Sequence, residues 1–110
     1  MFFVNTKTLR IEPNAFKEFK NLESLSISKN DIKSIESNMF PENLLQLILN
    51  DNKLKSLPSD LSNALPKLNN LYVENNLIAS FSEAPFGKFP ELTYIHIGGK
   101  SYLLFFSKSK

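Results

Sequence analysis

Few side chains in this sequence have the chemistry of a catalytic or metal-binding group. His96 is the one histidine and there is no cysteine, so no thiolate nucleophile and no cysteine-containing metal site can form. Asp51 and Glu74 are carboxylates of the kind used as a general acid and base, but they lie in separate segments and no spacing pairs them. These residues predict no catalytic centre, no metal site and no cofactor.

Two short motifs resemble functional sites, a phosphate-binding loop and a ligand pair, but neither fits on closer inspection. The stretch "GGKS" at 98–101 is only superficially like a phosphate-binding loop, because the earlier glycine is missing and no helical pattern follows. Ser59 and Asp60 follow Pro58, which is typical of the start of a helix and is favoured over a ligand pair. The sequence therefore argues against an enzyme.

Composition excludes other classes. The 13 basic and 11 acidic residues give a formal net charge of +2, which is too balanced to indicate binding to nucleic acid or to an anionic membrane. The apolar runs "MFFV" and "YLLFF" are shorter than a signal-peptide core of about 7 residues or a membrane span of about 20. No N-x-[ST] sequon occurs, so N-glycosylation is not expected. We predict one small domain over residues 1–110.

Apolar residues recur at a fixed spacing. Each copy begins with three apolar residues, the second three positions after the first and the third two positions after the second. An Asn follows three positions later, and another apolar residue two positions after the Asn. The copies are Leu22-Leu25-Ile27-Asn30-Ile32, Leu44-Leu47-Leu49-Asn52-Leu54 and Leu68-Leu71-Val73-Asn76-Ile78. A fourth begins with Leu92, Ile95 and Ile97. Such repetition predicts a solenoid, whose units bury their apolar sides only against their neighbours.

The second half of each copy carries further apolar residues, among which Phe is frequent. Phe16, Phe40 and Phe86 each follow another apolar residue by five positions, and the second copy offers Leu61 and Leu65 instead. We expect these side chains to fill the wider side of each coil.

The pattern L-x-x-L-x-L-x-x-N-x-L with a later Phe resembles the leucine-rich repeat, in the longer form of Toll-type receptors, Slit-like guidance proteins and matrix proteoglycans. The resemblance covers residues 11–105. It implies an α/β repeat fold: a short, curved, right-handed solenoid with a parallel β-sheet on the concave face and loops or short helices on the convex face. The predicted units are 1–21 (partial), 22–43, 44–67, 68–91 and 92–110, the last being divergent. In that last unit Lys100 takes the place of the Asn and Tyr102 the next apolar place, so it is either a terminal cap or the end of the repeat.

The resemblance gives Asn30, Asn52 and Asn76 a structural role. After each strand the chain turns inside the coil, and buried backbone groups there need hydrogen-bond partners. The Asn side chain has two donors and an acceptor, so one residue can serve several of these groups.

The residues between the inward apolar positions are predicted to point outward in columns across the strands. The central column is Ser26, Ile48, Tyr72 and His96. The column before it is Ser24, Gln46, Asn70 and Tyr94. The column after it is Ser28, Asn50, Glu74 and Gly98, with Lys29, Asp51, Asn75 and Gly99 at the strand exits. In the family, protein ligands usually dock on this face, which makes candidates of Ile48, Tyr72, Tyr94, His96, Gln46, Asn70 and Glu74. The alternative is that these are ordinary solvated strand residues.

Two functions remain open. The first is a non-enzymatic protein-binding module that uses the concave face. The second is a structural segment of a larger leucine-rich-repeat receptor or matrix protein, with no ligand contact of its own. The expected partner is a protein, with neither nucleic acid nor membrane insertion, and the chain is expected to be a monomer or to self-associate weakly through its ends. The repeat class suggests an extracellular or cell-surface location, although cysteine caps, a signal peptide and sequons are lacking.

Overall fold

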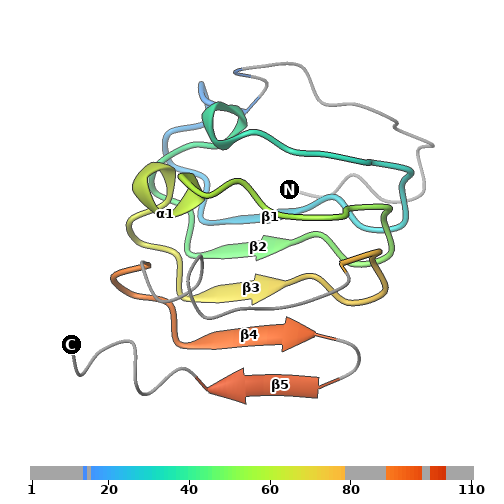
Figure 1. The fold of residues 1–110 in the computed structure, drawn as a ribbon. Helices are drawn as coiled ribbons and strands as arrows, with labels where there is room; N and C mark the ends of the chain where they lie inside the picture. The colour runs from blue at the N-terminus through green and yellow to red at the C-terminus, as the bar shows by residue number, and fades with distance from the viewer. Residues whose placement is uncertain (1–13, 15, 79–88, 98–99, 104–110) are drawn as a thin grey trace.

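The computed structural model describes residues 14, 16–78, 89–97 and 100–103. These residues contain a five-stranded sheet in the order β1-β2-β3-β4-β5. The strands are β1 (Ser24–Ser26), β2 (Gln46–Ile48), β3 (Asn70–Tyr72), β4 (Tyr94–Ile97) and β5 (Lys100–Leu103). Strands β1 to β4 are parallel and stack in chain order, so that each coil lies on the preceding one (Figure 1). The predicted leucine-rich-repeat solenoid with its parallel sheet is therefore confirmed.

The strand register follows the sequence repeat. Leu25 pairs with Leu47, Leu47 with Leu71, and Leu71 with Ile95. All four side chains are buried, at 2% exposure or less, because the same position of each unit faces the interior. A single core runs through the coils, as expected where each unit covers the apolar side of the next.

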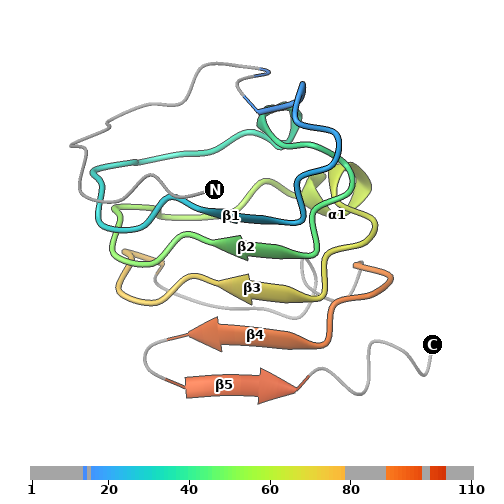
Figure 2. The same cartoon turned by 180° about the vertical axis from the view of Figure 1, so that it is seen from behind.

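The side of the coils opposite the sheet holds two short helical turns. These are the 3-10 helix η1 (Ser37–Met39) and the α-helix α1 (Leu61–Ala64), which lie one above the other (Figure 2). Helix α1 begins directly after Asp60, in agreement with the helix start predicted there. The Asp60 carboxylate does not cap its own helix but accepts a hydrogen bond of 3.0 Å from the Ser37 hydroxyl, which links the two coils.

The predicted second-half apolar residues fill this side of the coil. Phe40 and Phe16 are buried, and their rings stack with centroids 6.4 Å apart and an interplanar angle of 8°. Leu61 and Leu65 are also fully buried, as expected for the unit that has no Phe at this position. Phe86 lies outside the described residues.

The fourth unit departs from the predicted repeat after Ile97. Strand β5 runs antiparallel to β4 and pairs Ile97 with Lys100. Lys100 fits the place of the repeat Asn by number but begins a returning strand, so the parallel repeat does not continue after Ile97. The two intervening residues in the sequence are both Gly, a dipeptide that two-residue hairpins favour. The columns predicted to continue through Gly98 and Gly99 fall on residues outside those described.

Candidate functional site

The strand register brings the predicted outward residues into two columns on the face opposite the core. One column pairs Ser26 with Ile48, Ile48 with Tyr72, and Tyr72 with His96. The other runs through Ser24, Gln46, Asn70 and Tyr94. Six of the seven candidate residues are half-buried and Tyr94 is exposed. Their side chains are therefore accessible to solvent while still packing against neighbouring residues.

Three rings gather at the β3–β4 end of this face, and we call them the aromatic patch: Tyr72, Tyr94 and His96. The Tyr72 and His96 rings are parallel within 2°, with centroids 3.8 Å apart. The Tyr94 ring lies beside His96, with a centroid separation of 6.3 Å. His96 Nε2 lies 3.5 Å from Asn70 Oδ1, which ties the ring to the neighbouring column. Rings that hold one another in this way lose little further side-chain entropy when a partner covers them.

The β1–β2 end of the same face is chemically different. Its outward residues on β1 are serines. Ser26 is buried, at 4% exposure, and shares a hydrogen bond of 3.2 Å with Ser28, so this position of the central column does not meet solvent. Gln46 on β2 donates to the Ser24 hydroxyl at 3.3 Å. Small hydroxyl groups bonded among themselves offer a partner little apolar area, so the two ends differ in what they can bind.

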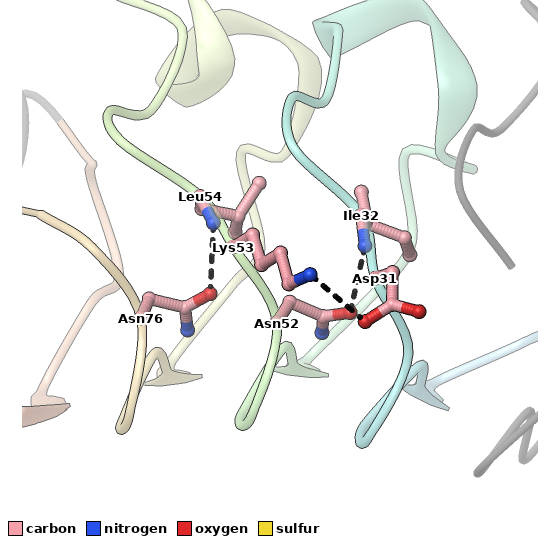
Figure 3. Close-up of polar contacts among 6 residues, drawn as sticks. All are labelled: Asp31, Ile32, Asn52, Lys53, Leu54 and Asn76. Atoms are coloured by element: carbon pink, nitrogen blue, oxygen red, sulfur yellow. Dashed lines mark hydrogen bonds and ion pairs between the residues drawn. The ribbon is translucent and has the colours of Figure 1, made fainter. Parts of the chain in front are cut away.

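The Asn side chains of the repeat lie behind the strands, in the turns that close each coil. Asn52 donates from Nδ2 to the carbonyl oxygens of Ile27 at 2.8 Å and Leu49 at 3.1 Å, and its Oδ1 accepts from the Ile32 amide at 3.3 Å. The Asn52 side chain thus bonds to its own coil and to the preceding one. Figure 3 shows the Oδ1 contact of Asn52 beside its counterpart in the next coil.

Asn76 repeats this arrangement one coil later. Its Nδ2 donates to Leu49 at 2.9 Å and to Val73 at 3.2 Å, and its Oδ1 accepts from the Leu54 amide at 3.1 Å. Asn30, in the first coil, donates to the Ser28 carbonyl. No buried side-chain nitrogen or oxygen within the described ranges lacks a hydrogen-bond partner. Asn52 and Asn76 thus each bond to backbone groups of two coils, and the structural role of the three Asn residues stays a prediction.

The strand exits contain a feature that sequence reasoning missed. Lys29, Asp51 and Asn75 occupy equivalent positions and all have left-handed backbone conformations, with φ of 56°, 59° and 55°. Asn and Asp tolerate this region better than other residues with a side chain, which is a signal that the recurrence of Asp51 and Asn75 contained. The Asn75 amide also donates to Asp51 Oδ1 at 2.8 Å, so side chains as well as backbones join the exits.

The two carboxylates considered for acid–base chemistry meet through their backbones. The Asp51 amide donates to the Glu74 carbonyl oxygen at 2.9 Å. In the part of the chain that the structure describes, no group of three or more His, Cys, Asp or Glu residues is arranged to hold a metal ion. Within the same ranges, no helix has the length and apolar character that crossing a membrane requires.

Comparison with known proteins identifies the class to which this fold and face belong. The model of the family described as leucine rich repeat matches residues 42–100, more than half of the chain. The chain belongs to the leucine-rich repeat family. It is thus a repeat module of the kind that generally binds proteins, and the relatives found are receptor and matrix proteins rather than enzymes.

Particular relatives cover this chain well, whereas the chain covers little of some of them. Toll-like receptor 2 of Ovis aries is 33% identical over 84 residues, which is 76% of this chain and 10% of the receptor. Fibromodulin of Sus scrofa is 31% identical over 93 residues, 84% of this chain and 61% of that protein. Keratocan of Mus musculus is 30% identical over 66 residues, 60% of this chain and 18% of keratocan. The chain therefore matches only part of each of these proteins.

Proposed function

We propose that the chain binds another protein through the outward face of its sheet, with the aromatic patch at the centre of the contact. Around these rings the interface includes Ile48, Gln46, Asn70 and Glu74. The observation that carries the proposal is the parallel stack of Tyr72 on His96, on the face that the core does not use. Large, stiff, amphipathic rings are the groups that most often anchor protein interfaces.

The second candidate is a structural segment without a ligand of its own. The relatives that the chain matches, Toll-like receptor 2 and fibromodulin, do not favour it over protein binding. On this reading the rings only pack across the strands, as aromatic pairs on a sheet do. The two functions differ in one measurable respect: a binding face affects affinity more than stability, and a structural face affects stability alone.

Photo-crosslinking tests the proposal even while the partner is unidentified. A benzoylphenylalanine replaces Ile48, at the middle of the face, or Phe19, which is 44% exposed and lies outside the strands. Both proteins are incubated with a mixture of secreted proteins, and the products are identified by mass spectrometry. We expect a specific product from position 48 that is absent from position 19.

Affinity measurements with the purified partner then decide between the two functions. Tyr72→Ser is expected to raise the Kd about tenfold or more, since truncating an interface anchor costs about 2 kcal/mol. Phe19→Ser removes an exposed aromatic ring elsewhere and is expected to leave the Kd unchanged. If Tyr72→Ser lowers the melting temperature and leaves the affinity as it was, the structural function is correct and the binding proposal is wrong.

A further inference from the structure

The charged groups on the binding face differ in sign from one end to the other. The two outward columns contain no Asp, Glu, Lys or Arg, and Glu74 follows Tyr72 by two residues, just beyond the end of β3. Asp51 follows at the neighbouring strand exit, whose backbone bonds to that of Glu74. The basic residue at the equivalent exit, Lys29, belongs to the first coil. Carboxylates therefore follow strands β2 and β3, whereas a lysine follows β1.

These carboxylates are not neutralised within the described part of the chain. The ion pair found there joins Lys53 to Asp31 at 3.5 Å, away from the aromatic patch. Asp51 accepts a hydrogen bond from the neutral Asn75 amide, and the Glu74 carboxylate bonds to no described side chain. A partially buried carboxylate without a cation next to it favours a positively charged ligand group.

The aromatic rings favour the same kind of ligand. The faces of Tyr rings attract cations, and a guanidinium also stacks on them because it is planar. In an extended chain, residues two apart point to the same side and lie about 7 Å from each other, and Glu74 follows Tyr72 by two, just beyond the end of β3. An extended side chain can span this distance, with its methylene stem against the rings and its charged end at the carboxylate. Arginine has such a stem and a fork of donors that matches a carboxylate.

We propose that the binding face captures an arginine side chain of its protein partner, with the stem on Tyr94 and His96 and the guanidinium between Tyr72 and Glu74. This inference rests on the proposed function and names the chemistry of the partner. An acidic partner residue would find no cation among the described outward columns, and a purely apolar one would leave the Glu74 carboxylate without a counter-charge and less hydrated.

The test uses N-acetyl-arginine amide as the probe and NMR as the readout. His96 is the one histidine in the chain, so its ring signals are unambiguous. We expect the probe to shift the ring signals of His96 and Tyr72 in a saturable manner. N-acetyl-citrulline amide has nearly the same shape without the charge, and is expected to produce much smaller shifts at equal concentration. Equal shifts from the two compounds, or none from either, would overturn the inference.

Variants locate the charge that attracts the probe. Glu74→Gln is expected to weaken binding about threefold or more, the size of a partly exposed charge contact. Its matched control is Glu42→Gln, which removes an exposed carboxylate outside the sheet strands and is expected to leave binding unchanged. Tyr94→Leu keeps apolar bulk and removes the ring, and is expected to weaken binding as well. If both glutamate variants bind the probe alike, Glu74 does not recognise the cation and the proposal fails.

The outcomes also separate this inference from the proposed function. If Tyr72→Ser loses partner binding but the unsubstituted protein does not bind the arginine probe, the face is a protein-binding site that does not recognise arginine. If Tyr72→Ser still binds the arginine probe, the proposed arginine site is wrong, whether or not the variant binds the partner protein.

Discussion

The inward and outward sides of the same strands follow different rules. Inward positions repeat: Leu25, Leu47 and Leu71 are the same residue, at 0% exposure, in three successive coils. Outward positions of the same strands change from Ser26, which is buried, to Ile48 and Tyr72, which are half-buried. The interior restricts each position to one size and polarity because it is close-packed, whereas solvent accepts nearly any side chain. Variation on the outward side is therefore where this chain can acquire a particular partner.

The strand exits combine the two sides within a few residues. Asn52 and Asn76 face the interior and bond to backbone groups of two coils, while Asp51 and Asn75, just before them, lie toward solvent. The Asn is thus a polar residue under the constraints of a core residue. We therefore expect the loss of stability caused by a substitution to depend on the number of contacts it breaks inside the coil, and not on the polarity of the residue.

The largest loss of stability is expected from the inward side. Leu47→Ala removes a fully buried side chain at the centre of the sheet, with a strand on each side. Lost burial and the cavity left behind are expected to lower the free energy of unfolding by about 2–5 kcal/mol. Chemical denaturation followed by circular dichroism measures the loss. Leu77→Ala, at a position that is 56% exposed, is the control and is expected to cost far less.

The next largest loss of stability is expected from the repeat Asn residues, Asn52 and Asn76. Asn52→Ala leaves backbone groups of two coils without the partner that the side chain supplies, at a cost of about 1–3 kcal/mol. Asn76→Ala breaks the equivalent bonds but is expected to cost less of that range, because Asn76 is only half-buried. The same denaturation experiment measures both. An unfolding curve unchanged by Asn52→Ala would show that water satisfies these backbone groups and that the Asn52 side chain adds no stability.

The outward rings are expected to have a smaller effect on stability. Tyr72→Ser breaks a ring stack worth about 0.5–1.5 kcal/mol and leaves the core intact. The measurement is the melting temperature, compared with that of Leu47→Ala under the same conditions. A loss as large as that of the leucine variant would mean that the two sides of the strand are equally structural, and the comparison would fail.

Sequence reasoning reached the parts of this fold that the repeat determines. The period, the inward residues through Ile95 and the outward columns through His96 follow from one pattern, because each coil repeats the same buried environment. It did not predict the turn-back of β5, since Lys100 fits a repeat position by number although the chain has reversed. Spacing alone does not distinguish a further coil from a hairpin, and the Gly pair at 98–99 was the available signal.

The strand positions of the candidate residues were predictable from the sequence, but the geometry of their side chains was not. Column membership followed from alternation along the strands, so Tyr72 and His96 were expected to be neighbours. Their parallel stacking at 3.8 Å was not, because ring orientation depends on rotamers that the packing around them selects. The left-handed strand exits were missed for a related reason. Backbone conformation there is imposed by coil closure, and Lys29 gives no hint of it.

The left-handed backbone conformation at the strand exits leads to the smallest expected effect, which is also the one expected to increase stability. Lys29 adopts φ of 56°, a region that costs a residue with an ordinary side chain more than it costs Asn or Gly. Asp51 and Asn75 occupy the same place with side chains suited to it. Lys29→Asn is therefore expected to raise the free energy of unfolding by about 0.5 kcal/mol. For a domain of this size, this corresponds to a rise of about 2–4 °C in melting temperature.

Lys33→Asn is the matched control for this last substitution. It removes the same charge from an exposed lysine of the same coil that is not among the residues with positive φ. It is expected to leave the melting temperature unchanged or slightly lower. A rise in both variants would assign the gain to charge, because the net charge falls equally in each. A rise in Lys29→Asn alone assigns it to the backbone, and then the solenoid closes its coils most stably when the strand exit matches the left-handed turn that the interior imposes.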